Sequence, residues 1–152
     1  GYAMPHIILI LALMFLVTGC STPDKRHPPL EEVRVMPAPE PEEPQCDYHS
    51  KGLASWYGHE LAGNKTASGE KFNPDGISVA HRTLPFGTLL HVTLDDLSRG
   101  GNPEGVYVRV NDRGPFKRGR IVDLSWGAAK KLGMMDTQRV HVYKCSEPAG
   151  QS

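Results

Sequence analysis

The chain has 152 residues, enough for one domain with a modest hydrophobic core plus a tail, and two full domains would be crowded. Lysine plus arginine and aspartate plus glutamate are equal at 17 each, so the formal net charge is zero. A balanced charge gives no electrostatic reason to expect a nucleic acid as a partner, and we expect none.

Residues 1–19 have the character of a signal peptide. Residues 7–17 are almost uninterruptedly apolar, but a run of this length is shorter than the ~20 residues that span a bilayer. Residues 16–20, LVTGC, resemble the lipobox at which bacterial lipoproteins are cleaved and lipidated on the cysteine, here Cys20. The missing lysine or arginine before the run is a departure from that pattern. A buried helix is the alternative, but it would need polar residues on one face, and none occurs before Thr18.

Residues 20–45 form a segment rich in proline and glutamate. Such a composition cannot bury a core, and the prolines favour an extended polyproline II conformation. We expect a tether that holds a folded domain away from a membrane surface. A proline-rich ligand for another protein module is the alternative.

Two cysteines remain once Cys20 is assigned to lipid, and they bracket the expected domain at residues 46–146. In an oxidising compartment Cys46 and Cys145 can form a disulfide. Two unpaired thiols are the alternative. A metal site is not expected, because neither cysteine has the C-x-x-C or Cys/His spacing of metal ligands.

The strand signals in residues 46–146 are short and separated by glycine or proline, which indicates a small all-β barrel. We expect strands at 53–57, 77–81 and 88–94, a surface loop at 95–105, and a strand from Val106 whose other face can line a groove. Ile121 to Leu124 is the next strand. Ser125 is placed to cap a short helix at 126–132, with Gly133 past its end and a last strand at 139–144. Residues 147–152 are a tail.

Asp112 is the first candidate for chemistry, because it lies where an apolar strand meets the turn Asn111-Asp112-Arg113-Gly114-Pro115. A carboxylate in that position is held by the sheet yet open to a ligand. The alternative is that Asp112 only hydrogen-bonds its own turn.

Four blocks of sequence resemble the rare lipoprotein A family, in the same order along the chain. They are GLASWYG at 52–58, TASGE at 66–70, AHRTLPFGT at 80–88, and VNDRGPF at 110–116 followed by GRIVDLS at 119–125. The resemblance implies a double-psi β-barrel and a lytic transglycosylase that acts on peptidoglycan glycan strands without peptide stems. Better-known members of the family carry a C-terminal peptidoglycan-binding domain, for which we expect no room here, so septal targeting is not carried over.

The resemblance assigns three catalytic residues. Asp112 would be the acid and base, Glu70 would disfavour the ionised form of Asp112 by like-charge repulsion, and His81 would bind a sugar hydroxyl or stabilise charge. On the residues alone, Glu70 could be a solvated loop carboxylate and His81 a core histidine. Asp123 competes for the catalytic role, but its position before the helix cap favours a structural task, bonding loop amides. Candidates for substrate binding are Tyr57, Trp56, Arg113 and Phe116.

The leading hypothesis is therefore a lipoprotein of the outer membrane that faces the periplasm and cleaves peptidoglycan to 1,6-anhydro-muramyl products. No cofactor and no metal are expected, and the expected partners are glycan strands and the membrane. The alternative is a non-catalytic, expansin-like module that binds peptidoglycan. A glycoside hydrolase of the same barrel type remains a third possibility.

Overall fold

The computed structural model describes Gly19, Ala38 and residues 42–147. All but the last residue of the expected signal peptide, the lipid site Cys20, most of the tether and all but one residue of the tail lie outside the described residues. Within the described part, no helix is both long enough and apolar enough to cross a membrane.

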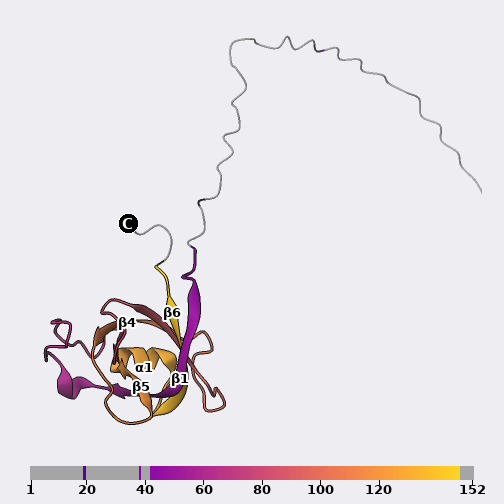
Figure 1. Ribbon diagram of the computed structural model, residues 1–152. Coiled ribbons are helices and arrows are strands. Elements are labelled where there is room, and N and C mark those ends of the chain that lie inside the picture. Colours follow the sequence, from indigo (N-terminus) through magenta and orange to yellow (C-terminus); the bar gives the residue numbers. More distant parts are fainter. Residues whose placement is uncertain (1–18, 20–37, 39–41, 148–152) are drawn as a thin grey trace, which may run out of the picture. The chain divides into compact units, whose positions relative to one another are not determined.

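Six strands form a closed barrel, accompanied by one α-helix and one 3-10 turn (Figure 1). The prediction of a small β-barrel with one short helix is confirmed. The elements are β1 (Cys46–Tyr57), η1 (His59–Leu61), β2 (Ser78–His81), β3 (Leu89–Leu94), β4 (Val106–Asp112), β5 (Arg120–Ser125), α1 (Trp126–Leu132) and β6 (Gln138–Cys145).

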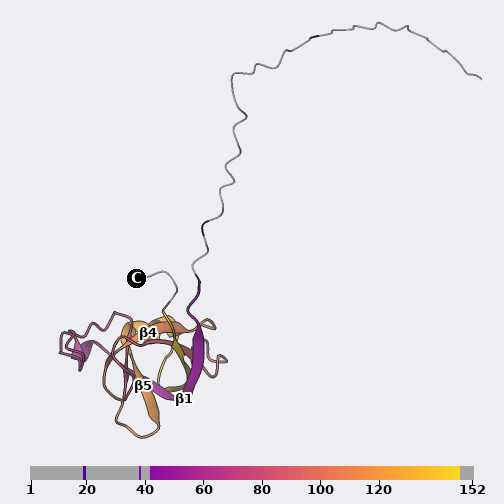
Figure 2. The same ribbon diagram turned by 45° about the horizontal axis from the view of Figure 1, so that its top comes forward.

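The strands follow one another around the barrel in the order β1, β5, β2, β4, β3, β6, and β6 closes onto β1. Two of the six pairings are parallel, β1 with β5 and β2 with β4, and the other four are antiparallel. β1, β4 and β5 can be followed around the barrel in Figure 2. Because neighbours in space are rarely neighbours in sequence, segments far apart in the chain meet on one surface.

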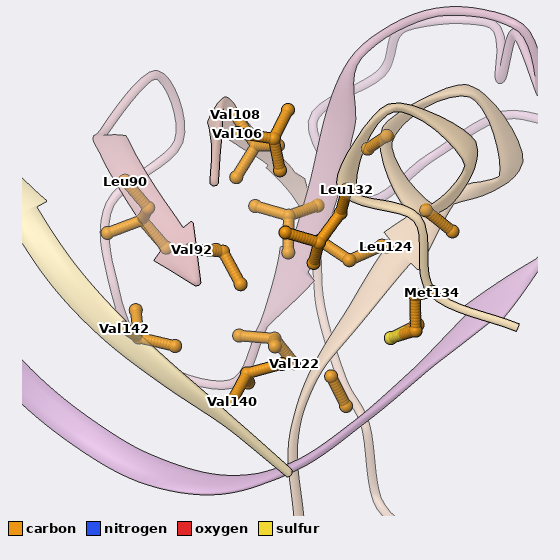
Figure 3. Packing of buried hydrophobic residues seen from close by; sticks show 14 of the residues in the cluster. Leu90, Val92, Val106, Val108, Val122, Leu124, Leu132, Met134, Val140 and Val142 are labelled. Atoms are coloured by element: carbon orange, nitrogen blue, oxygen red, sulfur yellow. The ribbon is translucent and has the colours of Figure 1, made fainter. Parts of the chain in front are cut away.

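The barrel interior is filled by aliphatic side chains that alternate along the strands (Figure 3). Val106, Val108 and Val110 of β4 point inward, and α1 adds Leu132 to the same cluster. The alternation of hydrophobic residues predicted β3 and β4 correctly because one face of each strand is buried and the other is not.

β1 begins seven residues earlier than the predicted strand at 53–57, at Cys46. Its first part is mostly polar and exposed, so it carries no strand pattern in the sequence. It is a strand because it pairs with β6 from Cys46 to Ala54. The pairing places Cys46 directly opposite Cys145, and the two are joined by a disulfide with an S–S distance of 2.00 Å.

The helix has the predicted bounds, since both of its ends are set by local chemistry. Ser125 is the N-cap, and its Oγ accepts a hydrogen bond from Ala128 N. Gly133 ends the helix with φ of 77°, in the left-handed region that glycine adopts without strain.

Candidate active site on the outer face of the barrel

A bulge in β4 shapes the candidate site. Val79 of β2 pairs with Val110, but the next residue, Ala80, pairs with Asp112, so Asn111 is an extra residue in β4. Such a bulge re-aims the side chains at and after it. Val110 is buried in the core, whereas Asn111 and Asp112 both lie half-buried at the surface. The turn predicted at residues 111–115 therefore begins two residues later than expected, and Asp112 is held by the sheet.

One oxygen of the Asp112 carboxylate is held by two backbone amides. Oδ1 accepts hydrogen bonds from Ala67 N at 2.9 Å and from Arg113 N at 2.8 Å. Within residues 42–147 no group hydrogen-bonds the second oxygen, Oδ2. The bond to its own turn, expected as the alternative to catalysis, is thus present, and it orients the carboxylate while leaving one oxygen for a ligand.

The loop at residues 64–72 brings Glu70 to the same region. Ser68 N donates to Asn111 O at 3.2 Å, which fastens the loop to the bulge. Glu70 Oε2 accepts a hydrogen bond from Asn111 Nδ2 at 3.1 Å. Because Asn111 directly precedes Asp112, this bond ties the exposed Glu70 to the segment that carries Asp112. The structure brings Glu70 and Asp112 together around Asn111.

An open hollow of about 450 Å³ lies beside these residues. Its wall includes Glu70 and Asn111, the outward side chains Tyr107 and Arg109 of β4, and Phe86 from the loop after β2. The sequence predicted that the face of β4 bearing Tyr107 and Arg109 could line a groove, and this is confirmed. It did not single out Asn111 or Phe86 as site residues, although they lie in the sequence blocks VNDRGPF and AHRTLPFGT.

A second carboxylate, Asp123, lies on the other side of Ala80. Ala80 pairs with Asp112 in β4 and with Asp123 in β5, so the two aspartates flank it at a backbone separation of about 10 Å, two strand spacings. Asp123 Oδ1 accepts from Ser55 Oγ at 2.6 Å and from the Arg120 guanidinium. The expectation that Asp123 hydrogen-bonds loop amides is therefore wrong in its partners, because its carboxylate is bound by two side chains.

Tyr57 lies in β1 two residues after Ser55, whose hydroxyl binds Asp123. Burial, followed by the negative charges of Asp112 and Asp123, raises the pKa of Tyr57, so the phenol is neutral. The hydroxyl is buried and has no hydrogen-bond partner among the described residues. The ring packs against Phe72 with centroids 4.6 Å apart. Because Phe72 packs against the Tyr57 ring, that face cannot stack on a sugar ring. The hydroxyl is the part of Tyr57 without a hydrogen-bond partner among the described residues.

His81 lies apart from the two carboxylates of the site. It pairs with Val122, a core residue, whereas Ala80 pairs with both aspartates, so successive side chains place His81 on the opposite face of β2. Its ring lines a separate hollow of about 280 Å³ with His49 and Arg82. The wall of the hollow that contains Glu70 includes neither His81 nor Asp112, but Asp112 directly follows Asn111 of that wall.

The His81 ring is a neutral imidazole with a fixed tautomer. Nδ1 accepts from Thr83 N at 3.2 Å and Leu84 N at 3.1 Å, so Nε2 carries the proton. Burial, and then the positive charges of His49, Arg113 and Arg82, lower the pKa of His81. Nε2–H is left as a hydrogen-bond donor.

The other expected substrate-binding residues differ in their availability. Arg113 lies over the Phe86 ring at 3.9 Å and donates to Leu84 O at 2.8 Å, so its guanidinium holds a loop. Trp56 packs against Trp126 with centroids 4.7 Å apart and is 36% exposed. Phe116 is 84% exposed and is free to contact a ligand. In the described part of the chain, no group of three or more histidine, cysteine, aspartate or glutamate residues is arranged to hold a metal ion.

Comparison with known proteins matches residues 49–143 to the family model described as lytic transglycolase. A probable endolytic peptidoglycan transglycosylase RlpA of Nostoc sp. is 45% identical over 122 residues, which cover 70% of this chain and 32% of the relative. The endolytic peptidoglycan transglycosylase RlpA of Pseudomonas aeruginosa is 38% identical over 139 residues, covering 91% of this chain and 34% of the relative. The chain thus spans about a third of the length of these relatives.

Among solved structures, a mutant expansin of Clavibacter michiganensis in complex with cellohexaose matches with a TM-score of 0.50 and 22% identity. The match covers 67% of this chain and 52% of the expansin. At this identity the similarity shows a shared fold.

Proposed function

The chain belongs to the rare lipoprotein A family of double-psi β-barrel proteins, and we propose that it is an endolytic lytic transglycosylase of peptidoglycan. Membership of this family supports the proposal, because the similar proteins of Nostoc sp. and Pseudomonas aeruginosa are named as endolytic peptidoglycan transglycosylases. The observation that carries it is the Asp112 carboxylate, with Oδ1 held by two amides and Oδ2 unpartnered among the described residues.

In the proposed reaction Asp112 acts first as an acid and then as a base. It gives a proton to the glycosidic oxygen as the bond to C1 of N-acetylmuramic acid breaks. It then takes the proton from the C6 hydroxyl of the same sugar, whose oxygen bonds to C1. The proton count balances without a water molecule, and the product is a 1,6-anhydro ring.

Glu70 and His81 have different parts in this proposal. Glu70 accepts a hydrogen bond from Asn111 Nδ2, the residue before Asp112, so we assign Glu70 to positioning the segment that carries Asp112. His81 lies in the other hollow, so we assign its Nε2–H to binding a sugar hydroxyl away from the bond that breaks. Tyr107 and Phe86 supply aromatic surface in the larger hollow.

The Asp112→Asn variant tests the function. Asparagine can still accept from Ala67 N and Arg113 N but cannot transfer a proton, so we expect the rate to fall by ~10²-fold or more. Glycan strands stripped of peptide stems are incubated with the full chain, and anhydro-muramyl products are measured by mass spectrometry. Asp47→Asn, at an exposed position of β1, is the matched control and keeps wild-type activity.

Four outcomes distinguish the alternatives and test the proposed substrate. Full activity in Asp112→Asn, with a thermal melt like that of the wild type, leaves Asp112 as a structural residue only. A wild-type protein that binds stripped glycan but releases no product supports the expansin-like binding module. Products with reducing ends in place of anhydro rings support a hydrolase. Faster cleavage of stripped strands than of peptide-bearing strands supports the proposed substrate.

We also propose that the protein is an outer-membrane lipoprotein that faces the periplasm. The apolar run at 7–17 and the lipobox-like residues that end at Cys20 support this proposal, as does Ser21 in place of aspartate after the cysteine. In this form Cys20 carries acyl chains, and residues 21–45 tether the barrel. Cell fractionation tests this proposal. If the Cys20→Ala protein is still cleaved after the same N-terminal segment and still fractionates with membranes, Cys20 does not carry the lipid anchor.

A further inference from the structure

Four aromatic side chains lie in a row across the outside of the barrel. Tyr48 of β1 is directly opposite Tyr143 of β6, Tyr143 is opposite His91 of β3, and His91 is opposite Tyr107 of β4. The ring centroids are 5.8 Å, 6.0 Å and 4.5 Å apart in that order. We call these four residues the aromatic row.

The aromatic row is accessible to a ligand and ordered in advance. Tyr48 is 61% exposed and Tyr107 41% exposed, while Tyr143 and His91 are half-buried between them. His91 Nε2 lies 2.7 Å from Glu104 O, and because a carbonyl only accepts, the ring must donate there. That bond fixes the His91 ring in its stack with Tyr107, so little side-chain entropy is lost on binding.

The aromatic row begins at the candidate active site. Tyr107 lines the hollow of about 450 Å³ that also contains Glu70. From Tyr107 the row crosses three strand spacings to Tyr48, a distance of about 14 Å. A chain molecule held in the hollow can therefore continue along the row.

The chemistry of the row favours a carbohydrate. Tyrosine and histidine rings combine an apolar face with a polar edge, which matches the C–H faces and hydroxyl edges of sugar rings. Two sets of charged groups near the row are paired among themselves: Arg109 with Glu147 at 2.6 Å, and Asp95 with Lys51 and His141 at 2.8 and 2.7 Å. This pairing makes these groups less available to a strongly ionic ligand.

We propose that the aromatic row is an extended binding surface for the part of a glycan strand that lies beyond the hollow that contains Glu70. The identity of the strand as peptidoglycan rests on the proposed function, whereas the surface itself rests on the row. Because three of its rings, Tyr48, Tyr143 and His91, lie beyond the hollow that Tyr107 lines, the row gives the protein a preference for long strands over short fragments.

The experiment measures binding in the full chain carrying Asp112→Asn, so that cleavage does not remove the ligand. Long stripped glycan strands and a muramyl disaccharide are titrated against this protein, against Tyr48→Ala, and against Tyr48→Ala combined with Tyr143→Ala. We expect about tenfold weaker binding of long strands for the double variant. The phenylalanine versions at both positions keep the rings and most of the affinity.

Met135→Ala is the matched control, because Met135 is an exposed apolar side chain, 72% accessible, outside the row. The proposal expects long strands to bind Met135→Ala as tightly as the parent, and expects the disaccharide to bind all variants alike. Unchanged binding of long strands to the double variant, or to Tyr48→Ala if the double variant melts early, would show that the row only stabilises the sheet.

The inference and the proposed function can fail separately. If wild type forms anhydro products but the row variants bind like Met135→Ala, the extended surface is wrong and the transglycosylase stands. If wild type forms no such product while the row variants lose affinity for glycan, the surface stands and the enzyme does not. Equal loss of disaccharide binding would place the effect in the hollow and overturn the extended surface.

Discussion

Single side chains on the outer face of the barrel decide what chemistry the site can perform. Asn111 adds one residue to β4, and because of it Asp112 faces the surface beside Ala80 in place of the core. Ala80 is small and buried, and it separates Asp112 from Asp123. The two aspartates then differ by their partners: Asp123 is bound by Ser55 and Arg120, whereas Asp112 keeps Oδ2 for a ligand.

Among the described residues, two buried side-chain atoms of the site have no hydrogen-bond partner, the Tyr57 hydroxyl and Asn111 Oδ1. We expect Tyr57→Phe to keep the packing against Phe72 and to leave the free energy of unfolding unchanged or raise it by up to about 1 kcal/mol, because a buried unpaired hydroxyl is removed. Urea unfolding measures this. A loss of more than about 1 kcal/mol would reveal a hydrogen bond, such as one through water.

At the level of elements, the site depends on the junction of β5, α1 and the segment before β2. The fully buried Ser125 joins them: its Oγ donates to Gly76 O at 2.6 Å and accepts from Ser78 N at 3.1 Å and Ala128 N at 3.3 Å. Gly127 allows this approach, since a Cβ there would lie 2.4 Å from Asp75 O. β2, which carries Ala80, is thereby fixed at its start.

Replacement of Ser125 by alanine should destabilise the protein by about 2 to 3 kcal/mol, because one cap and two further buried hydrogen bonds are lost together. The exposed loop serine Ser98 is the control, and Ser98→Ala should change stability by less than about 0.5 kcal/mol. Equal thermal melts for the two variants would contradict the role of Ser125 as the junction.

At the level of the whole molecule, the disulfide holds the two ends of the barrel sequence together. Cys46 and Cys145 are 99 residues apart, in adjacent strands, and the bond lies at the first residue of β1 and the last of β6. The described residues before Cys46, 42–45, and those after Cys145, 146–147, both adjoin the same end of the β1/β6 pair.

Removing the disulfide should lower stability substantially. Closing a loop of about 100 residues is worth roughly 4.7 kcal/mol in the chain-entropy model, which is an upper figure. We expect Cys46→Ser with Cys145→Ser to melt well below wild type, and a reducing agent to lower the melt of wild type but not of the double variant. Thiol labelling of denatured, unreduced protein provides the check, and labelling at both positions would rule the bridge out.

The sequence alone determined the features that depend on short stretches of chain. The alternating valines of β4 predicted a strand with one buried face, and Ser125 and Gly133 set the ends of α1 because caps act within a few residues. The four sequence blocks identified the family and drew attention to Asp112, Glu70 and His81. The apolar run and the residues before Cys20 also predict a signal peptide and a lipid anchor, and these segments lie almost entirely outside the described residues.

Only the tertiary structure decided which of these residues meet. The polar first half of β1 is a strand because β6 lies beside it, and the bulge at Asn111 exists only relative to β2. A hydrogen bond from Asn111 joins the loop residue Glu70 to the Asp112 region. Strand pairings place His81 on the other face and align four rings from four strands into the aromatic row. The physical reason is that strand register is a relation between distant segments, and a shift of one residue reverses the face on which every side chain lies.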